Sequence, residues 1–158
     1  MTRIDAGAVR DARPPEGLVR ALNPIVRTVL RSPLGGGVGA LAVIDHHGRR
    51  TREARHVVAA WHELDGRGFV VTPAGWRANF VGGAPAVVRH GGRTRTMTGT
   101  LVDDTAAVAD TLQRLFDAGH PPRTVGLAID DGHRIDAADV VAVRRAIVWF
   151  DPAVGATT

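Results

Sequence analysis

The chain contains no cysteine, no tyrosine and no lysine, and it has a single serine, Ser32. Without cysteine it has no disulfide framework, no thiol nucleophile and no thiolate metal site. Ser32 precedes a proline and no Gly-x-Ser-x-Gly motif is present, which argues against a serine hydrolase. The apolar runs are no longer than a strand and the first residues form no apolar core, so we expect neither a membrane span nor a secretory signal. These absences favour a cytoplasmic protein.

The seven histidines do not fall at the spacings of metal ligands. His46 and His47 are adjacent and would point to opposite sides of an extended chain. His56 and His62 would share a strand face but lie about 20 Å apart, at about 3.3 Å per residue. No His-Glu-x-x-His motif is present. We therefore expect no metal site.

All 20 basic side chains are arginines, and the net charge is +4. Guanidinium groups match phosphate and carboxylate groups in bidentate geometry. An anionic ligand and a coding bias toward arginine are both open explanations. Binding to nucleic acid is disfavoured, because aromatic residues make up only 4% of the chain and few rings are available to stack on bases.

The length of 158 residues and the hydrophobic pattern predict one domain built mainly of strands. We expect a flexible tail over residues 1–15, a single domain over 16–151 and a second flexible tail over 152–158. Helices are predicted over Gly17–Arg31, from a cap at Asp103 or Asp104 to Ala118, and from Asp136 to Arg145. Strands are predicted at Gly39–Asp45, Arg52–Glu63, Arg67–Thr72, Pro85–Arg89, Arg93–Leu101, Val125–Ile129 and Ala146–Phe150. Short strands joined by hairpins indicate an α+β fold, an antiparallel barrel with helices packed on it.

Two polar segments at strand ends are candidates for an anion-binding site. The first, which we call the basic turn, contains Arg49, Arg50 and Arg52. The second follows the strand that ends at Thr72 and contains Thr72, Trp76, Arg77 and Asn79. Hairpin topology could bring both segments to one end of the barrel, where backbone N–H groups of a short helix favour an anion. Core packing for Trp76, a surface charge for Arg77 and a helix or turn cap for Asn79 are the open alternatives.

A series of motifs runs in order from Leu22 to Ala118. It starts with a Leu-Asn-Pro-Ile-Val-Arg helix and the basic turn, and continues with Gly-Trp-Arg-x-Asn-Phe at Gly75–Phe80 and Gly-Gly-Ala-Pro at Gly82–Pro85. Gly-Thr at Gly99 and an acid-capped helix complete the series. In this order the motifs resemble the deazaflavin-dependent nitroreductase family of the flavin/deazaflavin oxidoreductase superfamily.

The resemblance implies a split antiparallel β-barrel of the FMN-binding type that binds deazaflavin coenzyme F-420, or alternatively FMN. It implies hydride transfer between the coenzyme and a small organic acceptor, by a monomer or homodimer. By motif position, the coenzyme-binding residues are Arg49, Arg50, Arg52, Thr72, Trp76, Arg77 and Asn79; no catalytic residue is implied. Because the chain lacks tyrosine and has a short loop after Thr72, the alternative is a non-catalytic carrier of a flavin, haem-derived or fatty-acid ligand on the same fold.

Overall fold

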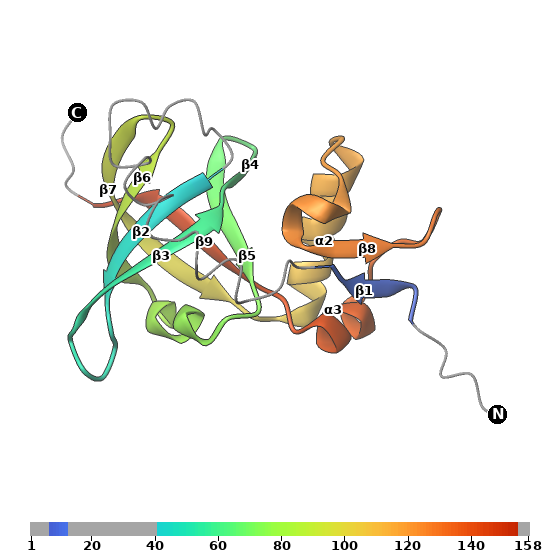
Figure 1. Ribbon diagram of the computed structural model, residues 1–158, viewed down its shortest axis with the longest axis horizontal. Coiled ribbons are helices and arrows are strands. Elements are labelled where there is room, and N and C mark those ends of the chain that lie inside the picture. Colours follow the sequence, from blue (N-terminus) through green and yellow to red (C-terminus); the bar gives the residue numbers. More distant parts are fainter. Residues whose placement is uncertain (1–6, 13–40, 155–158) are drawn as a thin grey trace.

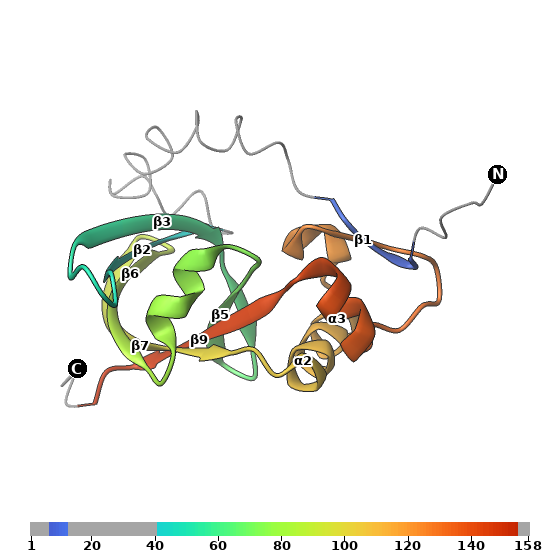
Figure 2. The ribbon, with the colours of Figure 1, turned by 90° about the horizontal axis from the view of Figure 1, so that it is seen from below.

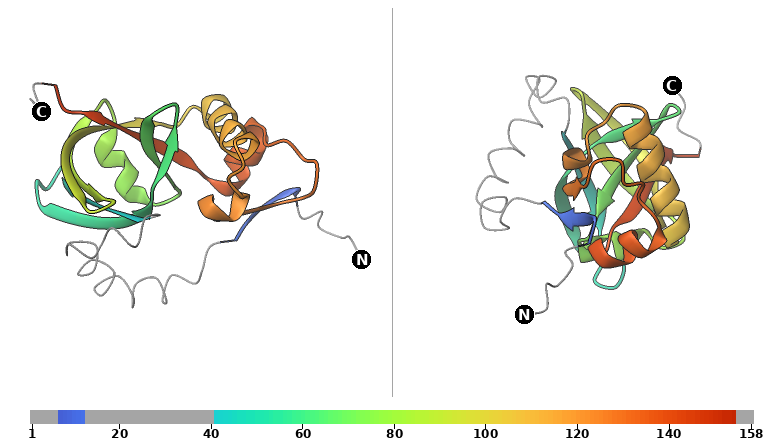
Figure 3. Two further views of the ribbon diagram at one scale, coloured as in Figure 1. Left: turned by 90° about the horizontal axis from the view of Figure 1, so that it is seen from above. Right: turned by 90° about the vertical axis from the view of Figure 1, so that its right-hand side faces the viewer.

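The structure, a computed structural model, describes residues 7–12 and 41–154 (Figure 1). A curled sheet forms one half of the molecule, and the helices α2 and α3 lie side by side in the other half (Figures 1 and 3). The strands are β1 (Val9–Asp11), β2 (Leu41–His47), β3 (Ala54–Ala60), β4 (His62–Leu64), β5 (Arg67–Thr72), β6 (Ala84–His90), β7 (Arg93–Val102), β8 (Leu127–Ile129) and β9 (Ala146–Pro152). The helices are η2 (Gly75–Phe80), α2 (Thr105–Asp117), η3 (Pro122–Val125) and α3 (Ala137–Val143). The helix predicted over Gly17–Arg31 lies outside the described residues.

The main sheet has seven strands in the order β3-β2-β6-β7-β9-β5-β4, and every pair is antiparallel. Trp61 alone separates β3 from β4, yet β3 pairs with β2 at one edge of the sheet and β4 pairs with β5 at the other. One extended stretch therefore joins both edges, and the sheet curls into a barrel (Figure 2). This confirms the predicted α+β fold class, a split antiparallel barrel with flanking helices.

Two hydrophobic cores hold the molecule together. The first fills the barrel with Ala42, Ile44, Val70, Phe80, Ala86, Val88, Met97, Val148 and Phe150. The second includes Phe69 and Ile147 from β5 and β9 and packs them against the helical half, with Val108, Leu112 and Leu115 from α2. Alternation along β5 and β9 explains this arrangement, because successive side chains point to opposite faces of a sheet. The helices therefore cover one outer face of the barrel.

The caps of the two α-helices are those that the sequence predicts. Asp104 caps α2 and accepts hydrogen bonds from the N–H groups of Ala106 and Ala107. The predicted helix start at Asp136 is also correct, and Asp136 and Asp139 form a capping box there. None of the described helices is long and apolar enough to cross a membrane.

Several elements differ from the predictions, and three differences have a clear structural basis. The helix expected to reach Arg145 ends at Val143, because Arg144 adopts a left-handed conformation with φ of 54°. Only the end of the strand predicted at Val125–Ile129 is extended, since Gly126, with φ of 71°, ends η3 before β8 begins. A short strand, β1, was not expected within residues 1–15; it pairs with β8, which places Val9 opposite Ile129.

Candidate functional site

The basic turn connects β2 to β3 and is closed by its own backbone. The Gly48 N–H donates to the Glu53 carbonyl over 2.9 Å, and the Arg52 N–H donates to the Gly48 carbonyl over 2.9 Å. Arg52 has φ of 59°, a left-handed conformation that L-residues other than glycine adopt at a cost of about 1–2 kcal/mol. The turn therefore holds its arginine side chains in solvent at the tip of a hairpin.

The residues that the structure describes do not balance the charge of the basic turn. Among the residues that the structure describes, no carboxylate forms an ion pair with Arg49, Arg50 or Arg52. The nearby Glu53 lies 3.7 Å from Arg55 instead. Three exposed guanidinium groups on one short turn therefore create a positive surface that favours an anion.

Asn79 joins the basic turn to η2. Its Oδ1 accepts a hydrogen bond from the Arg49 N–H over 2.8 Å, and its Nδ2 donates to the Trp76 carbonyl over 3.0 Å. The structure thus brings together two of the predicted segments, although they are 30 residues apart. Asn79 lies within η2, whose caps are Ala74 and Val81, so it is not the helix cap that the sequence left open, and its side chain links η2 to the basic turn.

Two hollows border this contact. The larger has a volume of about 630 Å³ and is lined by His47, Gly48, Arg49, Arg52, Asn79, Val81, Gly83, Ala84 and Pro85. The smaller has a volume of about 320 Å³ and is lined by Gly48, Arg49, Arg50, Thr51, Arg55, Ala78 and Asn79. Neither set of lining residues includes a carboxylate. The hollows share Gly48, Arg49 and Asn79, so one ligand could extend from one to the other.

Two further predicted residues, Thr72 and Arg77, form hydrogen bonds within the fold. The buried Thr72 accepts a hydrogen bond at Oγ1 from the Ala74 N–H over 3.0 Å. Arg77 donates to the carbonyls of Thr72, at 3.2 Å, and Arg144, at 3.0 Å, and so ties η2 to the end of α3. Neither side chain lines the two hollows. A coenzyme-binding role for Thr72 and Arg77 stays a prediction.

Trp76 packs against the core of the barrel. Its ring centroid lies 6.0 Å from that of His46 and 5.9 Å from that of Phe80. His46 is 3% exposed, and its Nε2 has no hydrogen-bond partner within the described part of the chain. Burial lowers the pKa of His46 below its usual value, so the ring is neutral at pH 7. Trp76 therefore takes the core-packing role that the sequence left open, and contact with a coenzyme ring stays a prediction.

Arg55 was missed by the sequence interpretation. It lies on β3 and lines the smaller hollow together with Arg49 and Arg50. Its position three residues after Arg52, on an exposed strand end, was the available signal. Over residues 7–12 and 41–154, no three histidine, aspartate or glutamate side chains gather as a metal site would require.

No protein-family model and no curated protein matches the chain. Among solved structures, it is similar to the FAD- and heme-binding protein from Mycobacterium smegmatis. The sequence identity is 14%, the alignment covers 94% of this chain and 70% of that chain, and the TM-score is 0.42. A similarity of this size carries no argument about the ligand of this chain, and the fold described above rests on its own strand order and register.

Proposed function

We propose that this chain is a cytoplasmic oxidoreductase that binds deazaflavin coenzyme F-420, or FMN, on its split barrel. Its reaction would be hydride transfer between the coenzyme and a small organic acceptor, carried out by a monomer or homodimer without nucleic acid. The basic turn is the observation that supports this most directly: Arg49, Arg50 and Arg52 border two adjoining hollows and have no carboxylate partner among the described residues. The ordered motif series supports the choice of coenzyme.

The residues at the basic turn fit the anionic part of either coenzyme. Arg49 and Arg52 border the larger hollow, whereas Arg50 and Arg55 border the smaller one. Guanidinium groups bind phosphate and carboxylate oxygens through paired N–H donors. The Oδ1 of Asn79 would not contact the anion, because an amide oxygen only accepts hydrogen bonds, here from the Arg49 N–H. Its role in the proposal is to hold the turn in place.

The bound coenzyme would supply the redox chemistry, and the protein would bind and orient it. Arg49, Arg50 and Arg52 would hold its acidic groups at the hairpin tip. The hydrogen bonds at Gly48 and Asn79 fix the backbone of the turn. They therefore restrict the positions that the arginine side chains can reach.

A titration of the purified chain with oxidised and reduced F-420, and separately with FMN, tests the proposal. We expect the fluorescence of one coenzyme to change in a saturable way with micromolar protein. Increasing the salt concentration should weaken this binding, because exposed charges are screened. No change with either coenzyme at low salt would remove the enzyme proposal.

The alternative is a non-catalytic carrier of a flavin, haem-derived or fatty-acid ligand. It is favoured by the position of Trp76, whose indole packs against His46 and Phe80 and does not line either hollow. Native mass spectrometry of freshly purified protein separates the two functions. A co-purifying apolar ligand, together with no affinity for F-420 or FMN, would select the carrier.

A further inference from the structure

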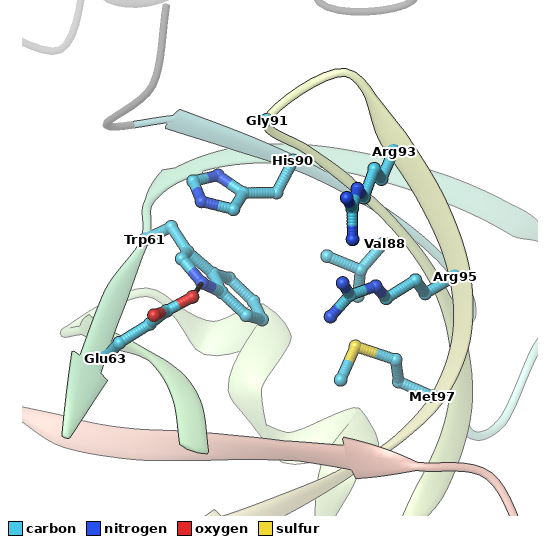
Figure 4. A pocket seen from close by; sticks show the side chains of 8 residues that line it. All are labelled: Trp61, Glu63, Val88, His90, Gly91, Arg93, Arg95 and Met97. Carbon is cyan, nitrogen blue, oxygen red and sulfur yellow. Dashed lines mark hydrogen bonds between the residues drawn. The ribbon is translucent and has the colours of Figure 1, made fainter. Parts of the chain in front are cut away.

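A third cavity lies at the other end of the barrel. It has a volume of about 170 Å³ and is lined by Trp61, Glu63, Val88, His90, Gly91, Arg93, Arg95 and Met97 (Figure 4). Strand β6 begins at Ala84, which borders the larger hollow, and ends at His90, which borders this cavity. Its six residue steps span about 20 Å at about 3.3 Å per residue. The cavity, which we call the barrel mouth, is therefore separate from the basic turn.

Polar side chains of the barrel mouth lie on the same strand faces as the barrel core, at its open end. Arg93, Arg95 and Met97 alternate along β7 and so share one face of that strand. Met97 belongs to the core of the barrel, which shows that this face points inside. On β6, Val88 belongs to the same core and His90 follows two residues later. Arg93 and Arg95 are exposed at the open end of this face, so their guanidinium groups lie at the rim of the cavity, above the buried Met97.

Arg93 and Arg95 have no anionic partner in residues 7–12 and 41–154. Within the part of the chain that the structure describes, no carboxylate forms an ion pair with Arg93 or Arg95. Figure 4 shows both guanidinium groups directed into the space that Trp61 faces from the opposite wall. Glu63 lies on the Trp61 side, where its Oε1 accepts the Trp61 indole N–H over 3.3 Å. A ligand with one anionic group on the arginine side would satisfy both guanidinium groups.

Trp61 forms a fixed, flat wall of the cavity. Its ring stacks on His90 with a centroid distance of 5.2 Å and an interplanar angle of 30°, and it also lies 5.6 Å from the Phe150 ring. The absence of a side chain at Gly68 makes room for it, because a Cβ there would lie 1.8 Å from the indole Cζ2. A rigid aromatic face loses little conformational freedom when a planar group packs on it.

We propose that the barrel mouth binds a small planar organic anion, with its carboxylate at Arg93 and Arg95 and its ring between Trp61 and Met97. The volume limits the ligand to about one ring, since pockets for drug-sized molecules measure roughly 300–1,000 Å³. Glu63 disfavours a second negative group on the indole side, so the ligand is a monoanion. This proposal does not rest on coenzyme binding at the basic turn.

The test uses the full chain labelled with ¹⁵N and follows its tryptophan indole N–H signals, of which there are three. Loss of one signal in Trp61→Phe assigns Trp61. Benzoate is the probe, benzamide is its neutral analogue and cyclohexanecarboxylate is a non-planar anion, all at constant ionic strength. We expect benzoate to shift the Trp61 signal in a saturable way and to bind at least tenfold more tightly than either analogue.

Two charge variants complete the experiment. Arg93→Gln/Arg95→Gln should weaken benzoate binding at least tenfold while leaving the other two indole signals in place, which shows that the protein is folded. Arg49→Gln/Arg52→Gln removes the same charge at the opposite end and should leave benzoate binding within twofold of the original chain. The proposal is overturned if benzoate leaves the Trp61 signal unchanged, if benzamide binds equally well, or if both variants lose benzoate binding to the same extent.

Discussion

Replacing Arg145 with methionine should destabilise the protein strongly. The Arg145 side chain is 0% exposed and joins the start of β9 to η3 and β1. It donates to the carbonyls of Val143 at 2.8 Å, Gly126 at 2.9 Å and Val125 at 3.3 Å, and its guanidinium lies 3.4 Å from Asp11. Methionine fills a similar volume but donates no hydrogen bond, so these acceptors would lose their partner.

The expected size of this effect follows from the burial of Arg145. Removing one partner from a buried, charged network typically costs about 3–5 kcal/mol. In a chain of this length, each kcal/mol lowers the melting temperature by about 2–4 °C, so we expect a fall of about 6–20 °C. The melting temperature of Arg145→Lys should lie between those of the original chain and Arg145→Met, because a single ammonium group keeps the charge but cannot reach all of these acceptors.

Urea unfolding and thermal melts of Arg145→Met and Arg10→Met measure the difference. Arg10 also connects β1 to the β8 end, through Asp130 at 2.9 Å, but the two side chains are 44% and 54% exposed. Because exposed ion pairs contribute little, Arg10→Met should cost at most about 1 kcal/mol. If Arg145→Met lowers the free energy of unfolding no more than Arg10→Met does, packing of the methionine replaces what the Arg145 hydrogen bonds contribute, and the reasoning is refuted.

Three further predictions concern packing, pH and backbone conformation. Gly99→Ala should cost about 1–3 kcal/mol in urea unfolding, because its Cβ would lie 2.5 Å from Phe80, whereas Gly75→Ala, with no atom within 4 Å of its Cβ, should cost almost nothing. Burial lowers the pKa of His62 to about 4 from 6.5, so the unfolded chain takes up the proton first. The contribution of neutral His62 to the free energy of unfolding is fully present above pH 6.5 and is lost toward pH 4, a decrease of up to about 3 kcal/mol. His62→Leu should remove this part of the pH dependence of stability. An equal pH slope in His62→Leu would contradict this. Arg52→Gly relieves a φ of 59° worth about 1–2 kcal/mol, and the greater freedom of glycine in the unfolded chain offsets about 0.5–1 kcal/mol of this, so the melting temperature should rise by about 1–3 °C while coenzyme binding weakens. Arg144→Gly, at a φ of 54°, should give the stability gain alone; a melting temperature unchanged in both variants would argue against strain.

Local turn chemistry made most strands predictable. The Gly91-Gly92 turn has φ of 58° and 75°, which glycine adopts without strain, and it joins β6 to β7 as expected. No local sequence pattern indicated that the sheet closes into a barrel. The stretch from Arg52 to Glu63 reads as one strand, and nothing local shows that it changes sheet edges at Trp61.

The candidate site was predictable only in part, for the same reason. Hairpin topology correctly placed the basic turn beside Asn79, since both lie at one end of neighbouring strands. The partner of Arg77 is the Arg144 carbonyl, 67 residues away, and only the docking of α3 beside η2 reveals it. At the barrel mouth, alternation along β7 puts Arg93, Arg95 and Met97 on one face, but only the closure of the barrel makes this face line a cavity.

Calorimetric titration of F-420 and FMN into two double variants tests the proposed function most directly. Arg49→Gln/Arg52→Gln removes two charges from the larger hollow, and Arg123→Gln/Arg134→Gln removes two charges from exposed positions in the helical half. Hydrogen bonds to charged groups contribute about 1.5–3 kcal/mol each, so the proposal predicts at least tenfold weaker binding in the first variant. The second variant should bind within twofold of the original chain. Equal affinity in the two variants, or no binding of either coenzyme by the original chain, would contradict a coenzyme site at the basic turn.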